Sequence, residues 1–317
     1  MILNQEKKSE LYRSIHGSVT VKLMIRPISD ISDINWIHVE ASTRCNAWCP
    51  ACPRNIEGHT LRPGLVPGDI DLDILSNTID ELPNLKTVQL CGNEGDPIAH
   101  RSAYRLISLI VKKNLKVQIY TNGGLRSKSW WRDLGKQLRN FDHCVWFGID
   151  GIDATHEIYR QGTKFEKVIE NAKSFIDAGG RAIWQFIPFA HNEHEINQCL
   201  ELSQVLGFQD FKIIKSFRDK NHKIRNYKDG KIIGNLEPST VYKKLFFRPK
   251  KESVEPSSCM HLSIPSIYMS VDGRFSPCCY FSDKRNFESI IELLKNVNIM
   301  TELNSPDVTC IDNCSFL

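Results

Sequence analysis

The stretch Cys45–Cys52, which reads CNAWCPAC, contains three cysteines spaced C-x3-C-x2-C and follows the apolar, β-prone run Trp36–Ser42 (WIHVEAS). A four-iron cluster normally takes four thiolates, and their number and spacing identify the site. Three thiolates on one loop hold three irons and leave the fourth open to a ligand that is not protein. A structural zinc site is instead closed by four ligands, and the nearest fourth candidate is His59, seven residues on. An iron–sulfur cluster therefore explains the triplet better than zinc or a redox dithiol.

Apolar runs and helix-patterned segments alternate after this loop. Short apolar runs predict strands at 36–42, 85–91, 115–120, 144–149, 181–188 and 208–214. Apolar residues at helical spacing predict helices at 71–82, 103–112, 130–138, 164–178 and 192–206. The fourth of these helices opens on a capping box, Thr163 to Glu166. The alternation predicts parallel βα units, so we expect an α/β fold with a partial (β/α)6, TIM-like barrel.

The cysteine triplet, placed just after a first strand, resembles the signature of the radical S-adenosylmethionine (SAM) enzymes. The resemblance extends from about Trp36 to Cys314. It implies a [4Fe–4S] cluster on Cys45, Cys49 and Cys52, whose open iron is chelated by the amine and carboxylate of SAM. Cleavage of SAM then gives a 5′-deoxyadenosyl radical that removes a hydrogen atom from the substrate. Where the family usually has an aromatic residue before the third cysteine, this chain has Ala51, and Trp48 is the nearby aromatic residue.

The resemblance also implies SAM contacts on the loops that follow the strands. The family's Gly-Gly-Glu-Pro motif, which holds the SAM amino group, corresponds to Glu94–Pro97 (EGDP), with aspartate in place of glutamate. A Thr-Asn-Gly turn, an Asp-Gly strand end and a downstream arginine also match the family. For Asn122, a plain turn role explains its type equally well. The implied SAM-binding residues are Trp48, Glu94, Gly95, Asp96, Thr121, Asn122, Asp150 and Arg160.

A second group of cysteines lies near the C-terminus. An Asp-Gly dipeptide at 272–273 predicts a β-hairpin, and a helix is expected near 289–294. The layout resembles the twitch domain, the short form of the SPASM auxiliary-cluster domain, and implies a second [4Fe–4S] cluster with no open iron. Zinc is the alternative for this group. The implied ligands are Cys259, Cys278, Cys310 and Cys314, with Cys279 as a substitute for Cys278.

The other cysteines, Cys91, Cys144 and Cys199, lie on apolar runs and are expected to be structural.

Four segments are predicted along the chain. They are an N-terminal extension at 1–34, with one edge strand at 19–25, the radical SAM partial barrel at 35–215, a basic connector at 216–255 and the twitch domain at 256–317. Residues 212–251 contain thirteen Lys or Arg against three Asp or Glu. This bias is typical of a solvated connector, or of a rim that attracts an anionic substrate or an acidic peptide.

Composition limits the class of protein. A hydrophobic content of 41%, a charged content of 25% and a net charge of +4 are ordinary for a soluble globular chain. The mild charge predicts no specific nucleic-acid binding, and no apolar run is long enough to predict a membrane span. The polar start of the chain predicts no signal peptide, and with eleven cysteines we therefore expect metal binding or buried thiols in a reducing cytoplasm.

The resemblance leaves two enzymatic functions and one of another class open. The first, which we expect, is the net two-electron oxidation of a small sugar- or alcohol-like substrate by an oxidoreductase, with the auxiliary cluster as electron acceptor. The second is modification of a ribosomally made peptide, which the short segment before the first strand disfavours and the basic connector favours. The third is a non-catalytic, metal-stabilised binding protein. Either enzyme needs an external electron donor such as flavodoxin or ferredoxin, and the sequence identifies no catalytic acid or base.

Overall fold

The computed structural model describes residues 28–56, 58–139, 142–214, 224–228, 230–240, 265–281 and 286–296. The expected edge strand at 19–25 and three of the expected auxiliary ligands, Cys259, Cys310 and Cys314, lie outside this part of the chain.

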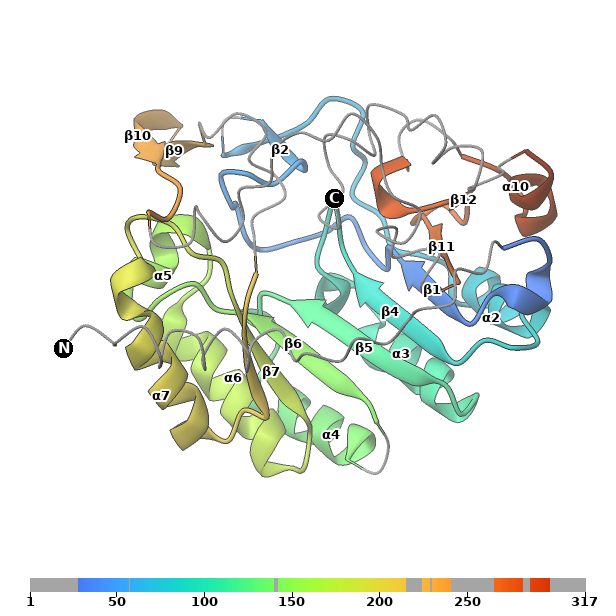
Figure 1. Ribbon diagram of the computed structural model, residues 1–317, viewed down its shortest axis with the longest axis horizontal. Helices are drawn as coiled ribbons and strands as arrows, with labels where there is room; N and C mark the ends of the chain where they lie inside the picture. The colour runs from blue at the N-terminus through green and yellow to red at the C-terminus, as the bar shows by residue number, and fades with distance from the viewer. Residues whose placement is uncertain are drawn as a thin grey trace.

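An eight-stranded sheet in the order β12-β11-β1-β4-β5-β6-β7-β8 forms the centre of the fold (Figure 1). Its six consecutive strands from β1 to β8 are parallel to their neighbours. They are β1 (Trp36–Val39), β4 (Thr87–Cys91), β5 (Lys116–Thr121), β6 (Cys144–Gly148), β7 (Ala182–Phe186) and β8 (Asp210–Ile213). The predicted α/β partial barrel with six parallel strands is therefore confirmed.

Helices cover one face of this sheet (Figure 1). They are α2 (Leu72–Glu81), α3 (Ala103–Lys112), α4 (Lys128–Leu138), α5 (Ala154–Tyr159), α6 (Phe165–Asp177) and α7 (Ile196–Leu206), with short 3-10 helices η1 (Ile31–Asp33), η2 (Pro97–Ala99) and η3 (Glu193–Glu195). Each long helix turns one apolar stripe to the sheet, as the helical spacing predicts. Gly207 ends α7 in the left-handed conformation.

The two faces of the sheet differ in chemistry. Along β5, Val117 and Ile119 are buried in the core under the helices, whereas Gln118 and Tyr120 alternate with them and are half-buried. Tyr120 stacks on Trp146 of the next strand, with ring centroids 5.1 Å apart. The face away from the helices is thus polar and aromatic.

The predicted capping box at the start of α6 is wrong. Its N-cap residue is Lys164, which makes no side-chain cap. The hydroxyl of Thr163 instead donates to the carbonyl of Arg160 and lies 2.9 Å from the buried ring of His156. The tertiary partners of Thr163 therefore replace the local cap.

The C-terminal hairpin continues the barrel sheet. It consists of β11 (Ser266–Met269) and β12 (Phe275–Ser276), and Gly273 in its turn has a φ of +82°. β11 pairs in parallel with β1, so the hairpin adds two strands beside the first strand of the barrel. The 3-10 helix η5 (Cys279–Phe281) and helix α10 (Ile290–Asn296) follow.

Part of the predicted connector is a second hairpin, which the sequence analysis missed. It consists of β9 (Ile224–Lys228) and β10 (Lys231–Leu236). Ile224 and Leu236 are buried in one apolar cluster with Cys49. The hairpin and the two short strands β2 (Asn55–Ile56) and β3 (Thr60–Leu61) lie beyond the ends of the barrel strands (Figure 1).

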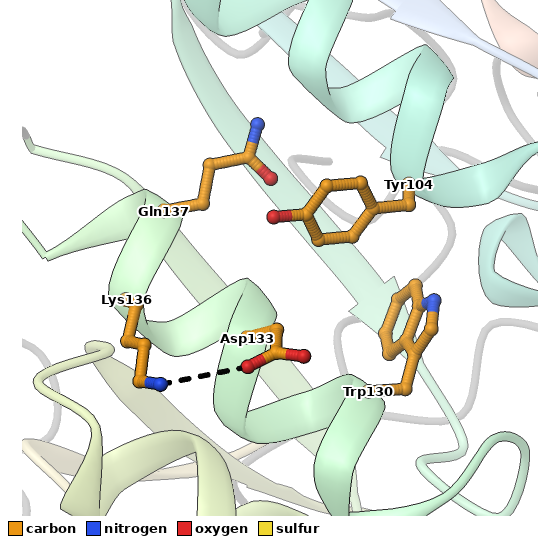
Figure 2. A pocket seen from close by; sticks show the side chains of 5 residues that line it. All are labelled: Tyr104, Trp130, Asp133, Lys136 and Gln137. Carbon is orange, nitrogen blue, oxygen red and sulfur yellow. Dashed lines mark ion pairs between the residues drawn. The ribbon is translucent and has the colours of Figure 1, made fainter.

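A cavity of about 740 Å³ lies in the helical layer rather than at the ends of the strands (Figure 2). It is open to solvent between α3 and α4, and its lining includes an Asp133–Lys136 ion pair of 3.6 Å. The lining residues are Tyr104, Trp130, Asp133, Lys136 and Gln137. Among the described residues, no helix combines the length and apolarity needed to cross a bilayer.

Candidate functional site

The cysteine triplet forms a compact loop directly after β1. Cys45, Cys49 and Cys52 all contact one apolar cluster, which also contains Tyr159 and Phe189. The amide of Cys52 donates to the carbonyl of Cys49 at 2.9 Å, so the second and third cysteines share a tight turn. The loop therefore presents three thiols from one short, well-anchored segment.

The loop is fastened to the segment after α5. The amide of Trp48 donates to the carbonyl of Gln161 at 2.7 Å. Gly162 has a φ of +83°, and a Cβ there would lie 2.6 Å from the carbonyl oxygen of Asn46. Only glycine allows this close approach of two backbones.

The surroundings of the triplet control the protonation of its thiols. Burial raises the pKa of the Cys45 thiol, and the neighbouring Asp96, Cys49 and Cys52 raise it further. This shift keeps the thiol protonated when no metal is bound, whereas a bound metal centre keeps coordinating thiols deprotonated. Binding of a metal cluster would therefore release protons from the three thiols.

A single metal ion fits the same loop less well. In the part of the chain that the structure describes, no three His, Cys, Asp or Glu side chains stand close enough to share one ion. The ring of His59, the candidate fourth zinc ligand, lies beside Gly230 of the β9–β10 hairpin. A four-iron cluster places each thiolate on a separate iron, so it needs no such close group of ligands.

Asp96 organises the loops after β4 and β5. Its carboxylate is 4% exposed and accepts hydrogen bonds from the Thr121 hydroxyl at 2.9 Å, the Asn122 amide at 2.8 Å and the Ile98 amide at 2.9 Å. Burial raises the pKa of Asp96, although these bonds oppose the shift. The three predicted site residues Asp96, Thr121 and Asn122 are thus brought together.

Asn122 connects these loops to the cysteines. Its side-chain nitrogen lies 3.5 Å from the sulfur of Cys45 and donates to the Asn46 side chain at 2.9 Å. Its side-chain oxygen accepts from the amide of Gly124 at 2.8 Å. The side chain of Asn122 thus caps its own turn and also faces Cys45, and its contact with SAM stays a prediction.

Asp150 and Arg160 form a buried ion pair beside the triplet. Asp150 is fully buried and accepts from Nε of Arg160 at 2.6 Å and from the Ile187 amide at 2.6 Å. A Cβ at Gly148 would lie 2.6 Å from a guanidinium nitrogen of Arg160, so this glycine makes room for the arginine. The arginine interacts electrostatically with Cys49.

Two arginines that the sequence analysis missed contact predicted site residues. Arg62 forms an ion pair with Glu94. The guanidinium carbon of Arg54 lies 4.9 Å from the centroid of the Trp48 ring, and this arginine is 5% exposed. A buried arginine is unusual without partners, but the sequence around these two residues has no pattern that reveals them.

Gly95 allows the loop after β4 to lie against the segment that leads to Cys45. A Cβ there would lie 1.9 Å from the carbonyl oxygen of Ser42 and 2.8 Å from that of Arg44. The amide of Asp96 donates to the same Arg44 carbonyl at 2.8 Å. The loop and the approach to the triplet are thus in direct backbone contact.

Gly95→Ala is therefore expected to lower the free energy of unfolding by about 1–3 kcal/mol, because the backbone must move to admit the methyl group. Urea unfolding measures this change. Gly68→Ala is the matched control, since the nearest atom to a Cβ there is 3.9 Å away, and we expect a change within about 0.5 kcal/mol. Equal losses in the two variants would contradict the close contact.

The C-terminal cysteines that the structure describes lie near the loop after β4. Cys278 and Cys279 are half-buried. The side-chain amide of Asn93 donates to the carbonyl of Cys279 at 3.1 Å. The predicted auxiliary site is therefore represented here by one pair of adjacent cysteines next to the predicted SAM loop. Cys144 and Cys199 are buried, and Cys91 is half-buried at the end of β4.

Comparison with known sequences gives limited similarity. No protein-family model matches the chain. The protein YfkA of Bacillus subtilis (strain 168) is 24% identical over 167 residues, which are 48% of this chain and 43% of YfkA. The chain therefore matches less than half the length of this relative.

Comparison with solved structures identifies the fold. Streptococcus suis SuiB bound to S-adenosylmethionine matches with a TM-score of 0.57 and 12% identity, over 87% of this chain and 67% of SuiB. SuiB bound to the precursor peptide SuiA gives 0.56 and 14%, over 90% and 70%. The protein anSMEcpe with bound AdoMet, which is SAM, gives 0.57 and 17%, over 90% and 81%. The fold of the chain is therefore similar to that of these SAM-bound proteins, and the predicted likeness to the radical SAM enzymes is confirmed at the level of the fold.

Proposed function

We propose that the chain is a radical SAM enzyme whose cluster is held by Cys45, Cys49 and Cys52. The observation that carries this proposal is the contact of Asn122 with the Cys45 sulfur at 3.5 Å, together with its bond to Asp96. It joins the thiols to the loops at the carboxyl ends of two parallel strands, where ligands bind in open α/β sheets. A [4Fe–4S] cluster held by these cysteines would supply the electron for reductive cleavage of SAM to methionine and a 5′-deoxyadenosyl radical.

The surrounding residues have distinct proposed roles toward SAM. Asp96 holds Thr121 and Asn122 in place by hydrogen bonds. The side-chain amide of Asn122 in turn orients the Cys45 end of the cysteine loop. Asp150 holds Arg160 toward Cys49, where the guanidinium can balance the charge of a thiolate or of the SAM carboxylate. The residues proposed to contact SAM directly are Trp48, Glu94, Gly95, Asn122 and Arg160.

We propose a second [4Fe–4S] cluster on Cys278 or Cys279, together with Cys259, Cys310 and Cys314. The contact between Asn93 and Cys279 supports a position near the loop after β4, which contains the predicted SAM contacts Glu94 and Gly95. An external donor such as flavodoxin or ferredoxin supplies the electrons.

We propose a peptide as the substrate. The structural likeness to SuiB bound to its precursor peptide, and to anSMEcpe bound to AdoMet and the Cp18Cys peptide, supports a peptide over a small molecule. The β9–β10 hairpin beside the cysteine loop also supports it, because its exposed side is apolar and basic. Exposed strands of this kind accept extended peptides. The exposed apolar and basic residues are Arg225, Lys231, Ile232 and Ile233.

Oxidation of a sugar- or alcohol-like small molecule is the second candidate. The face of the sheet away from the helices has half-buried glutamines on three strands, namely Gln89, Gln118 and Gln185. Their amides can donate to and accept from hydroxyl groups.

Anaerobic reconstitution followed by an iron count and an assay of reductant-dependent 5′-deoxyadenosine release tests the proposal. About eight irons per chain with SAM cleavage supports two clusters. About four irons with cleavage supports the first cluster and contradicts the proposed second one. Zinc in place of iron, without cleavage, contradicts the proposed class. Release that a pool of host peptides stimulates, and a pool of sugars and polyols does not, supports the peptide substrate.

The hairpin offers a direct test of the peptide proposal. Ile232→Asp and Ile233→Asp, in one double variant, are expected to weaken stimulation by the peptide pool about tenfold. The reason is that covering an isoleucine side chain completely contributes about 1.5–3 kcal/mol. A bound peptide would gain only part of this, because binding also costs conformational freedom. SAM cleavage without peptide should stay unchanged. Val205→Asp on α7, where the side chain is 82% exposed, is the matched control. Unchanged stimulation in the double variant would show that the peptide does not bind at this hairpin.

A further inference from the structure

The carboxylate of Glu40 is buried at a junction of three elements. It follows β1 and is 1% exposed. It accepts hydrogen bonds from the backbone amides of Asn93 at 2.7 Å and Glu94 at 3.2 Å, and from the Tyr268 hydroxyl at 3.1 Å. Hydrogen bonds to a charged acceptor are stronger than neutral ones. Glu40 thus binds the loop after β4 to the C-terminal strand β11.

The same loop is held at its start by His38. The Nε2 nitrogen of His38 pairs with the carbonyl of Cys91, the last residue of β4. Burial lowers the pKa of His38 to about 4, so the ring is neutral at pH 7 and donates through this nitrogen. Its ring lies edge-on to Tyr268, with centroids 5.0 Å apart. β11 therefore contacts both side chains that fix the loop.

The loop has little freedom between these contacts. A Cβ at Gly92 would lie 1.9 Å from the carbonyl oxygen of Gly95, so the turn is tight and its two ends move together. The Asn93 side chain donates to the carbonyl of Cys279, which follows β12. A shift of the C-terminal hairpin therefore reaches Glu94 and Gly95 through contacts that are all short.

We propose that Glu40 is a positioning residue for SAM binding and that Tyr268 acts through it. Glu40 holds the amides of Asn93 and Glu94 in place, and the Tyr268 hydroxyl couples their position to the C-terminal hairpin. This inference rests on the proposed function, and it adds that the SAM affinity of the barrel depends on a strand contributed by the C-terminal part of the chain.

SAM affinity of the reconstituted full chain, measured by anaerobic equilibrium dialysis, tests this inference. Glu40→Gln leaves one good acceptor oxygen and turns an NH2 group toward the loop amides, so the dissociation constant should rise about ten- to a hundredfold. Tyr268→Phe removes one donor and should raise it about three- to tenfold. Tyr104→Phe, on α3, is the matched control and should bind SAM as the wild type does. Iron content should be unchanged in all three.

A double-mutant cycle distinguishes an effect of Tyr268 through Glu40 from a general loss of stability around the loop. If Tyr268 acts through Glu40, Y268F has little further effect in the E40Q background. Equal effects of Y268F in both backgrounds, or wild-type affinity in E40Q with its iron retained, would overturn the inference. If E40Q does not fold, Y268F with wild-type affinity overturns it alone. A wild-type chain that binds iron but no SAM refutes the proposed function instead.

Discussion

Cys49→Ala is expected to abolish reductant-dependent SAM cleavage and to remove about four irons per chain. The cysteine is 7% exposed in the apolar cluster that contains the other two thiols, and its carbonyl also accepts from the Asn55 side chain at 3.3 Å. Removing one of three thiolates leaves the cluster with two protein ligands, which cannot retain it. Iron analysis and 5′-deoxyadenosine release on the reconstituted variant measure both losses.

Cys199→Ala is the matched control for this experiment. It is a fully buried cysteine on α7 within the main core, and burial raises the pKa of its thiol to about 12. We expect it to keep its iron and its SAM cleavage. If Cys49→Ala retained wild-type iron and cleavage, the triplet would not be the cluster site. If Cys199→Ala also lost iron, the losses would reflect folding rather than ligation.

The sequence predicts the barrel well because its signals are local. Each barrel strand is a short apolar run and each long helix an apolar stripe, so both are visible within about ten residues. The position of the site loops also follows from the strands, because parallel strands place their carboxyl ends at one edge of the sheet. For this reason the three predicted residues Asp96, Thr121 and Asn122 meet as expected.

The missed features depend on partners that are distant in sequence. Glu40 looks like an ordinary polar strand end, and its partner Tyr268 is 228 residues away. The β9–β10 hairpin has Ile232 next to Ile233 and an irregular register before Gly234, so it shows no alternation. Thr163 has the residue type of a cap, but His156 and Arg160 engage its hydroxyl. In each case a tertiary contact overrides the local pattern.

Asp150→Ala is expected to lower the free energy of unfolding by about 3–5 kcal/mol, because it leaves Arg160 buried without its counterion. The Arg160 side chain is 16% exposed and Asp150 is fully buried, so water compensates little. The Ile187 amide also loses its acceptor. Urea unfolding measures the loss. Asp177→Ala is the matched control, since its ion pair with Lys173 is exposed and such pairs contribute about 0–1 kcal/mol.

The converse variant, Arg160→Met, adds a pH dependence with a definite sign. Burial raises the pKa of Asp150, and Arg160 opposes that rise. Without the arginine the folded-state pKa is higher still, so the native state keeps a proton that the unfolded chain releases near its ordinary pKa of about 3.9. The contribution of Asp150 to the stability of Arg160→Met is therefore greatest below that value and is lost as the pH rises through the folded pKa, so the stability of the variant relative to the wild type should fall over this range. A stability no more dependent on pH than the wild type's would show that the arginine does not control the ionisation of Asp150.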